Sequence, residues 1–161
     1  MSTPPSFQYP VMGFEGAFYV GPAGSTSIAS MILAENVRNP KYSYKFDEVD
    51  ATTRRHKGTK AYAKGMKDVG ISFTLPNLKN DDGSRPADLA LILESLHNRR
   101  KPLAICMLDE DGGEGIFGDF EILGGDKSEE DEAIQEFEVE AKPSVGGRAI
   151  AWTEDGSYPT G

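Results

Sequence analysis

The residue types with the clearest chemical potential in this sequence are six cations crowded between residues 54 and 67, a stretch that contains no acid. Lysine and arginine bind phosphates and an aromatic ring stacks on a base, so such a segment can serve as a nucleic-acid-binding loop. The whole chain, however, carries a formal net charge of -9, which repels nucleic acid at long range, so weak or no binding is expected. The residues concerned are Arg54, Arg55, Lys57, Lys60, Tyr62, Lys64 and Lys67.

Two further interpretations of this basic segment are open. A merely solvated loop explains its polarity but leaves the one-sided sign of its charge unexplained. A partner formed by the acidic part of another copy accounts for the sign, because opposite patches steer association and set its register. The chain has such a part, since residues 109–140 contain fourteen acids and a single cation, Lys127.

Two groups of these acids are candidates for a binding surface. The first is an acid-rich turn that could collect oxygen ligands for calcium, but Gly113 stands where the calcium-loop template wants a ligand, and strands flank the turn in place of helices. A solvated hairpin turn is the favoured interpretation, and the second group is by default a solvated charge run before a strand. The first group is Asp109, Asp111 and Glu114. The second group is Glu129, Glu130, Asp131 and Glu132.

Nucleophilic catalysis would need Cys106 or a serine beside His56 or His97. Cys106 belongs to the apolar run "LAICML", where a thiol behaves as a small hydrophobe. His97 lies at the basic end of a predicted helix, and His56 lies among cations. The sequence contains no GxGxxG, P-loop, HExxH or CxxC motif, so we predict no catalytic residue, no metal site and no cofactor.

Length and composition favour one β-rich domain. A chain of 161 residues can bury a core by itself, and its 18 glycines and 10 prolines indicate many turns between short elements. The N-terminus lacks a basic region followed by an apolar one, and no eighteen consecutive residues are apolar. Neither secretion nor membrane insertion is therefore expected, and we expect a soluble protein made in the cytosol.

Alternation of apolar and polar residues predicts most of the strands. In the run 134–141, one face carries Phe137, Val139 and Ala141, which we expect to point inward. The other face carries three acids, which we expect to point outward; they are Glu136, Glu138 and Glu140. The predicted strands cover residues 18–20, 42–46, 69–75, 103–108, 116–122, 134–141 and 149–152.

One amphipathic helix is predicted between Pro86, which suits a first turn, and Pro102, which stops it. Its apolar stripe consists of Leu89, Ile92, Leu93 and Leu96, at helical spacing. If Leu93 packs against the sheet, Leu93→Ala should cost roughly 2–5 kcal/mol.

Three segments stand apart from these elements. The connection formed by residues 50–68 is unusually long for a hairpin unless it has a function of its own. An N-terminal arm, residues 1–30, and a C-terminal extension, residues 145–161, each contain one short predicted strand and are expected to be loosely held.

The order of these features resembles one family, the major tail tube proteins of long, non-contractile-tailed bacteriophages, with relatives in gene transfer agents. More distant relatives form the tubes of contractile tails and of type VI secretion. The similar stretches are "FDEVDATTRRHKGTKAYAKGMKDVGISFTL", "PADLALILESLHNRRKPLAICMLD" and "GIFGDFEILGGDKSEEDEAIQEFEVEAKPS". Their order carries the resemblance, which covers about residues 42–144. "KAYAKG" replaces the aromatic or large residue usual in the family's loop, and residues 1–30 align with nothing in the family.

The resemblance implies a single domain, residues 1–161, that is mainly β with one flanking α-helix, a β-sandwich or small barrel of the phage tail tube type. It implies hexameric rings that stack into a tube through which the genome passes. The basic residues named first would form an inter-ring assembly loop, and the acids of residues 109–132 its counter-surface. The acids of the strand 134–141 could face the lumen and repel the phosphates of passing DNA.

The resemblance also implies the partners of such a subunit: other copies of itself, the tape measure protein, the tail terminator and the tail tip. DNA would pass without specific binding, and no membrane is involved. The protein would belong to the virion tail and be assembled in the cytoplasm of a host bacterium. The alternatives are an inner tube protein of a contractile tail or type VI-like apparatus, a monomeric β-sandwich binding module, and an enzyme with an unrecognised site.

Overall fold

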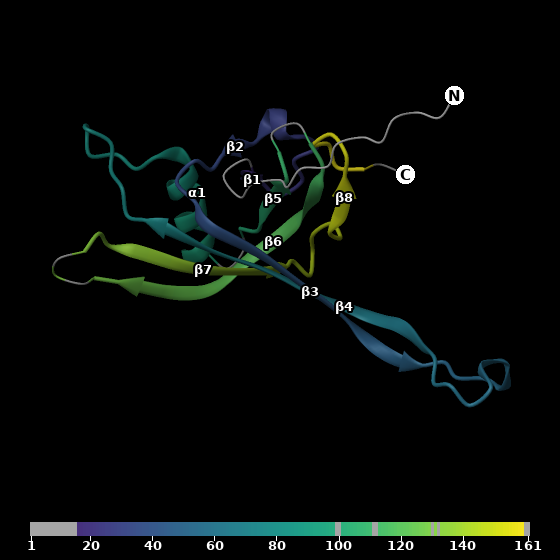
Figure 1. Cartoon of the computed structure of the whole chain (residues 1–161). Coiled ribbons are helices and arrows are strands. Elements are labelled where there is room, and N and C mark those ends of the chain that lie inside the picture. The colour runs from purple at the N-terminus through teal and green to yellow at the C-terminus, as the bar shows by residue number, and fades with distance from the viewer. Residues whose placement is uncertain (1–15, 99–100, 111–112, 130, 132, 160–161) are drawn as a thin grey trace, which may run out of the picture.

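The computed structural model describes residues 16–98, 101–110, 113–129, 131 and 133–159. Their main part is one antiparallel β-sheet, accompanied by one α-helix and two 3-10 turns (Figure 1). In chain order the elements are β1 (Ala17–Pro22), η2 (Ile28–Ser30), β2 (Ile32–Leu33), β3 (Arg38–Asp50), η3 (Arg54–His56), β4 (Tyr62–Pro76), α1 (Ala87–His97), β5 (Leu103–Leu108), β6 (Gly115–Ser128), β7 (Glu136–Pro143) and β8 (Ala151–Thr153).

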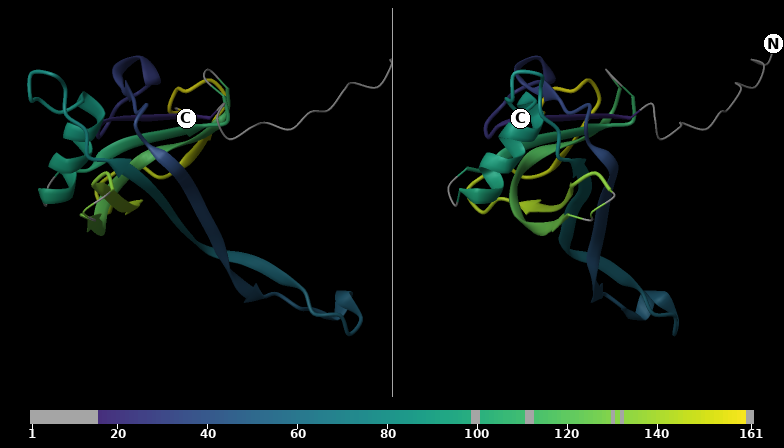
Figure 2. Two further views of the ribbon diagram at one scale, coloured as in Figure 1. Left: turned by 60° about the vertical axis from the view of Figure 1, so that its left-hand side comes forward. Right: turned by 90° about the vertical axis from the view of Figure 1, so that its left-hand side faces the viewer.

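The sheet runs in the order β2-β1-β5-β6-β7-β4-β3, with β8 paired to the start of β6. Phe18 of β1 and Phe73 of β4 have ring centroids 5.1 Å apart, although three strands separate β1 from β4 in the sheet. The sheet must therefore curl until its two halves face each other, and Figure 2 shows this curl from two sides. The prediction of a mainly β fold with one flanking helix is confirmed. The strands expected to form a sandwich or small barrel belong to one open sheet, which curls until its two halves face each other.

Two buried clusters hold the body together. The larger cluster fills the concave side of the sheet, where α1 adds Leu89 and Ile92 to residues such as Ile105 and Phe120. The smaller cluster lies on the other face of β1, β5 and β6, and includes Cys106. Because β5 is covered on both faces, its sequence is a continuous apolar run and shows no alternation.

The alternation in β7 is confirmed. Val139 and Ala141 are buried, Phe137 is half-buried, and Glu138 and Glu140 are exposed. Burial of one face also fixes the register of β7 against β4, because a shift by one residue would turn the acids into the core.

The helix is confirmed, but its buried face differs from the predicted stripe. Leu89 and Ile92 are fully buried, whereas Leu93 and Leu96 are only partly buried at the margin of the core. Leu93 thus packs against the core without being fully buried, and Asp88 and Ser95 complete the buried side of the helix. Asp88 accepts hydrogen bonds from the backbone N–H (3.4 Å) and the side-chain amide (3.3 Å) of Asn36. The Ser95 hydroxyl donates to the Lys101 carbonyl at 2.6 Å.

Both ends of the described chain are held more firmly than expected. In the predicted N-terminal arm, β1 pairs with β2 and β5 and contributes Phe18 and Val20 to the core, so only residues 1–15 of that arm lie outside the described residues. The C-terminal extension crosses the face of β1, β5 and β6. There, Tyr158 packs edge-on against Phe117, and its backbone N–H donates to the Thr26 carbonyl at 2.8 Å.

A buried ion pair anchors the C-terminal extension. The Arg148 guanidinium donates to both carboxylate oxygens of Asp119 at 3.0 Å, and its backbone N–H donates at 2.8 Å. Gly24 adds a fourth donor at 3.3 Å, and the guanidinium lies 4.2 Å from the centre of the Tyr158 ring. Burial raises the pKa of Asp119, but the hydrogen bonds from Arg148 and Gly24 outweigh it and hold this pKa below its ordinary value.

The helix face can be tested by comparing two leucine-sized side chains. Ile92→Ala should lower the free energy of unfolding by roughly 2–5 kcal/mol, because it opens a cavity in the core. Leu93→Ala should cost less, about 1 kcal/mol, because that side chain is only partly buried at the margin of the core. Chemical denaturation followed by far-UV circular dichroism measures both values, and equal losses would contradict the assigned face.

The ion pair makes stability depend on pH. A carboxyl whose pKa is lowered by folding stabilises the folded state above its unfolded pKa, and that stabilisation is lost as the pH falls through the folded pKa. Asp119→Asn should therefore cost roughly 2 kcal/mol at pH 7 and progressively less below about pH 4. Unfolding midpoints of the two proteins, measured between pH 7 and pH 3, should converge; parallel curves would contradict this role for Asp119.

Candidate functional site

The most distinctive feature of the structure is a two-stranded ribbon that projects from the sheet (Figure 1). The strand β4 pairs with β7 only between Ile71 and Pro76, so its N-terminal half pairs with β3 alone. We define the ribbon as residues 44–69 and its tip as residues 51–61. Nearly every side chain of the ribbon is exposed, because within the described part of the chain no third strand pairs with it and no helix covers it.

Part of the long connection predicted over residues 50–68 is a strand. Tyr62, Lys64 and Lys67 lie in β4, and only the tip joins the two strands. Alternation missed this part of β4 because "YAKGMKD" has no apolar face to bury. The strand is specified by its partner instead, through pairs such as Glu48 with Lys64 and Asp50 with Tyr62.

The tip is compactly folded and carries only positive charge. Thr52 bridges its base: the hydroxyl donates to Asp50 Oδ1 at 2.6 Å and accepts from the Ala61 N–H at 2.9 Å. The hydrogen bonds from the hydroxyl and N–H of Thr52 hold the pKa of Asp50 below its ordinary value. Farther out, the 3-10 turn η3 and the residues after it present four exposed cations that form no ion pair with any described acid; they are Arg54, Arg55, Lys57 and Lys60.

The other two cations of the segment belong to a different surface. A β-bulge opposite Phe46 and Glu48 inserts an extra residue into β4, so Lys64 and Lys67 emerge on the same face of the ribbon. Their ammonium groups lie 4.6 Å and 5.7 Å from the centre of the Phe46 ring. The structure therefore separates the six cations into a free tip and a pair held over an aromatic ring.

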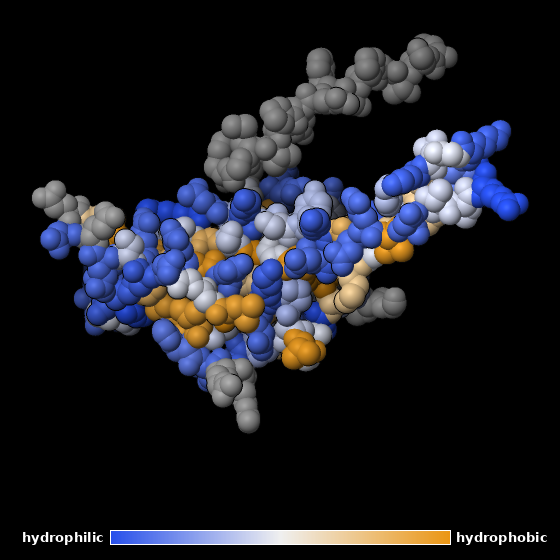
Figure 3. Space-filling model, turned by 90° about the horizontal axis from the view of Figure 1, so that it is seen from below, coloured by the Kyte–Doolittle hydropathy of each residue, from blue (hydrophilic) through white to orange (hydrophobic). Residues whose placement is uncertain are grey.

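An aromatic hollow of about 340 Å³ lies where this ribbon face meets the body. Tyr44 and Trp152, on its rim, are 66% and 56% exposed. The hydroxyl of Tyr42 is buried without a hydrogen-bond partner among the described residues. Figure 3 shows hydrophobic surface continuing from the body onto the near part of the ribbon, while the tip is hydrophilic. The alternation of Tyr42, Tyr44 and Phe46 predicted a strand but could not show that two of these rings lie outside the core.

The two predicted acidic groups do not form one surface within a subunit. Asp109 and Glu114 flank the turn before β6, whereas Glu129 and Asp131 follow its end, so about 45 Å of strand separates the groups. Asp111, Glu130 and Glu132 lie outside the described residues. Because Pro76 pairs with Glu136, the second group lies at the end of the body opposite the ribbon.

The three acids of β7 lie on the outer face of the curled sheet. Glu138 and Glu140 pair across the sheet with Thr74 and Ser72 of β4, and Glu136 forms an ion pair with Arg38 at 3.5 Å. The outward residues of β3, β4, β7 and β6 are thus mostly polar, which suits a surface that faces water.

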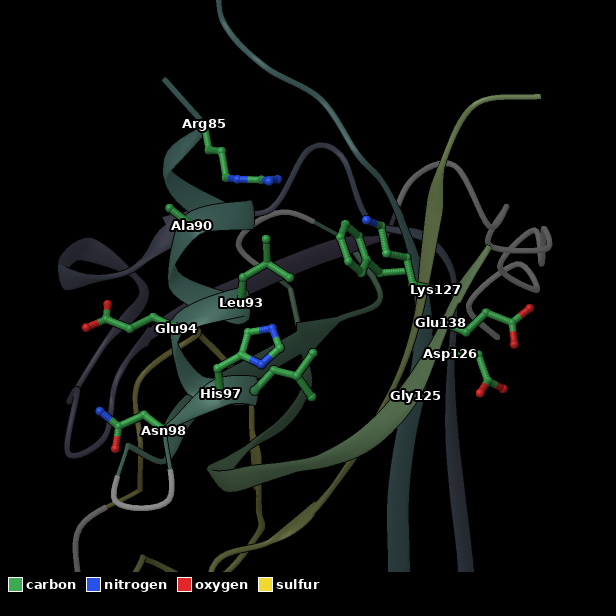
Figure 4. Close-up of a pocket in the computed structure, with 12 residues that line it drawn as sticks. Arg85, Ala90, Leu93, Glu94, His97, Asn98, Gly125, Asp126, Lys127 and Glu138 are labelled. Carbon is green, nitrogen blue, oxygen red and sulfur yellow. The ribbon is translucent and has the colours of Figure 1, made fainter. Parts of the chain in front are cut away.

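A groove of about 910 Å³ separates α1 from the far part of β6 and β7 (Figure 4). Its apolar lining consists of Ala90, Leu93, Leu96 and Phe137. Sequence analysis missed this site because the helix stripe was assigned wholly to the core. The available signal was the width of the stripe, because Leu93 and Leu96 extend it beyond the fully buried Leu89 and Ile92.

No catalytic arrangement emerges from the predicted candidates. His56 lies at the ribbon tip, His97 ends α1, and Cys106 is fully buried in β5, so the three occupy separate parts of the fold. Burial raises the pKa of the Cys106 thiol to about 12, which keeps it protonated. Among the described residues, no group of three or more potential ligands could hold a metal, and no helix could span a membrane.

Comparison with known proteins gives a clear result only at the level of structure. No protein-family model matches the sequence, and no curated protein matches it either. Among solved structures, the chain resembles the tail of an empty gene transfer agent particle with C6 symmetry, at 16% identity and a TM-score of 0.58 over 89% of this chain and 97% of that one. It resembles the SPP1 tail tube at 13% identity and a TM-score of 0.66, covering 91% of this chain and 80% of that one.

A third similar structure comes from the baseplate of the anti-feeding prophage, symmetrised six-fold. The identity is 8% and the TM-score 0.52, over 96% of this chain and 98% of that one. At such identities the likeness concerns the fold. The fold expected from the order of motifs is confirmed: the chain has the fold of phage tail tube proteins.

Proposed function

We propose that this protein is the subunit of a phage-like tail tube, in which rings of identical copies stack into a channel for the genome. The observation that carries the proposal is the ribbon, which leaves the body and exposes both of its faces. The fold likeness to tail tubes and tail particles supports the same function.

An isolated two-stranded ribbon is marginally stable in water, because it buries little apolar surface. Another copy of the chain can supply the missing cover. The ribbon and the acids beyond β6 lie at opposite ends of the body, so head-to-tail stacking brings them together. A contact between two different surfaces of identical subunits adds one copy after another. It ends in a closed ring if the rotation between copies brings the last copy back to the first, and otherwise it continues without limit, as in a growing tube.

Charge favours one acidic group as the counter-surface of the tip. Glu129 and Asp131 lie at the end of the body that a stacked neighbour presents to the ribbon, whereas Asp109 and Glu114 flank a turn at the other end of β6. We therefore assign the inter-ring contact to the tip cations and the second acidic group. Glu130 and Glu132 belong to that group in sequence.

Within a ring, the open edges of the sheet provide the lateral contacts. The order of strands ends at β2 and at β3, and neighbouring copies can cover both edges. The six-fold symmetry of the similar particles supports a hexamer. If the outer face of β7 lines the lumen, Glu138 and Glu140 repel DNA phosphates, so the genome slides without being retained.

This function has no catalytic step. It places the protein in a virion tail assembled in a bacterial cytoplasm, with tape measure, terminator and tip proteins as partners. The similarity to a baseplate component favours one alternative, an inner tube protein of a contractile or secretion apparatus. Co-purification with a sheath protein would distinguish this alternative.

Reversing the tip charge tests the proposed contact. The quadruple variant Arg54→Glu, Arg55→Glu, Lys57→Glu, Lys60→Glu should fold normally but fail to form tubes, because like charges then meet at each ring boundary. Negative-stain electron microscopy and circular dichroism measure the two properties. Raised salt should slow tube growth of the unmodified protein, since these charges are exposed.

A charge-preserving control separates electrostatics from shape. Arg54→Lys, Arg55→Lys, Lys57→Arg and Lys60→Arg together keep every positive charge at the tip and should still support tubes. Normal tubes from the glutamate variant would refute an electrostatic contact. If the unmodified protein remained monomeric at all concentrations, the tube function itself would be refuted.

Hydrogen exchange should report the ordering of the ribbon. In the free subunit, backbone amides of the ribbon should exchange much faster than those of β5, because the ribbon can open without disturbing the core. Assembly should slow exchange in the ribbon and leave β5 unchanged. Equal protection of the ribbon before and after assembly would contradict its role in stacking.

A further inference from the structure

We infer that the groove beside α1 binds a second copy of this chain through a surface that we call the Trp152 corner. This inference rests on the proposed head-to-tail association and adds a second contact to it. The corner comprises Asp109, Glu110, Glu114, Trp152, Glu154 and Asp155, all exposed.

Two cations, Arg85 and Lys127, and the imidazole of His97 point into the groove, and no acid of its lining does. Figure 4 shows Arg85, His97 and Lys127 directed into it, whereas Glu94 points away from α1 on the far side. Asp126 and Glu138 contribute backbone to the lining but point out of the other face of the sheet. The register agrees, since Asp126 pairs with Glu138 on the outer face while Lys127 shares the inner face with Phe137.

The floor of the groove is unfinished apolar surface. Leu93, Leu96 and Phe137 pack against the core but remain partly exposed. Lys127 lies 5.7 Å from the centre of the Phe137 ring and pairs with Glu129 at 2.5 Å, and Arg85 donates to Asn77 at 2.6 Å. These contacts hold the cations at the rim, so a fitting occupant combines an apolar group with acids.

The ribbon tip does not fit this description, because its charge has the same sign as the rim. The Trp152 corner does. Trp152 is the single tryptophan of the chain, and its indole N–H donates to Glu114 Oε2 at 3.3 Å. The acids of the corner have no cation beside them in sequence, since neither 109–117 nor 149–161 contains lysine or arginine.

A subunit cannot fill its own groove with its own corner. Thr153 pairs with Gly115 at the start of β6, whereas Gly125 and Lys127 line the groove near its end, about 35 Å further along the strand. The occupant must be another copy, in a contact between two different surfaces. A large aromatic side chain seated in an apolar groove and ringed by opposite charges has the composition of an interface hot spot.

The two contacts together would fix the direction of stacking. The end of the body that carries the basic ribbon also carries the acidic corner, and the opposite end carries the acids beyond β6 and the basic groove. A copy stacked in the reverse direction brings like ends together, so neither the ribbon tip nor the corner meets the surface assigned to it.

Because Trp152 is the single tryptophan, its fluorescence tests the contact directly. Emission should move to shorter wavelength as subunits associate, since the indole leaves water for the groove. Leu93→Glu should abolish this shift and raise the concentration needed for assembly more than about tenfold. Leu78→Glu, a matched change at an exposed leucine outside the groove, should leave both unchanged.

Tubes that form without any shift in Trp152 emission would overturn this contact and leave the tube function standing. Subunits that never associate would overturn both. A persistent shift in Leu93→Glu would also count against the groove, because the indole would then be buried elsewhere.

Cross-linking tests the pairing without relying on fluorescence. The natural Cys106 is buried and stays protonated, so introduced cysteines can be labelled selectively. A mixture of Glu154→Cys and His97→Cys proteins should give dimers with a short bis-maleimide linker, whereas either protein alone should give few. Equal yields from the mixture and from the separate proteins would overturn the corner-to-groove contact.

Discussion

A ribbon of two strands cannot bury its own surface, and this constraint governs the whole molecule. Beyond Val69 and Tyr44, no third strand among the described residues pairs with the ribbon, so its backbone pairs internally while most of its side chains face water. The body of the protein, in contrast, buries its apolar side chains: its curled sheet, α1 and the C-terminal extension enclose two apolar clusters. Stability therefore resides in the body, and the capacity to associate resides in what projects from it.

The distribution of charge follows the same division. The ion pair between Asp119 and Arg148 is buried and fixes the C-terminal extension, whereas the tip cations are exposed and form no ion pair with a described acid. Charges paired inside the body support the fold, and exposed charges at its ends are available to another copy, including Glu129 and Lys127, which pair with each other at the surface. The net charge of -9 is compatible with both roles, because the excess acid lies away from the ribbon tip.

The aromatic residues divide in a comparable way. Phe18 and Phe73 meet across the folded sheet and close the core, whereas Tyr44 and Trp152 remain largely exposed around the hollow at the base of the ribbon. A hollow rimmed by large exposed aromatic rings is uncommon on a surface that meets only water. Their position, between the body and the ribbon, agrees with a surface that is completed by assembly.

The sequence by itself determined the strands and the helix whose apolar residues repeat with a clear period, such as β7 with Val139 and Ala141, and α1 with Leu89 and Ile92. It also located the basic segment, because a run of one charge sign needs no structure to be recognised. Only the tertiary structure decided that Lys64 and Lys67 belong to a strand, since that strand has no apolar face and is specified by pairing with β3. It likewise decided that Leu93 borders a groove, and that Glu114 and Glu129 lie at opposite ends of β6. Periodicity reports which residues avoid water, but the partner of a polar strand and the distance between charges are set by how the sheet pairs and curls.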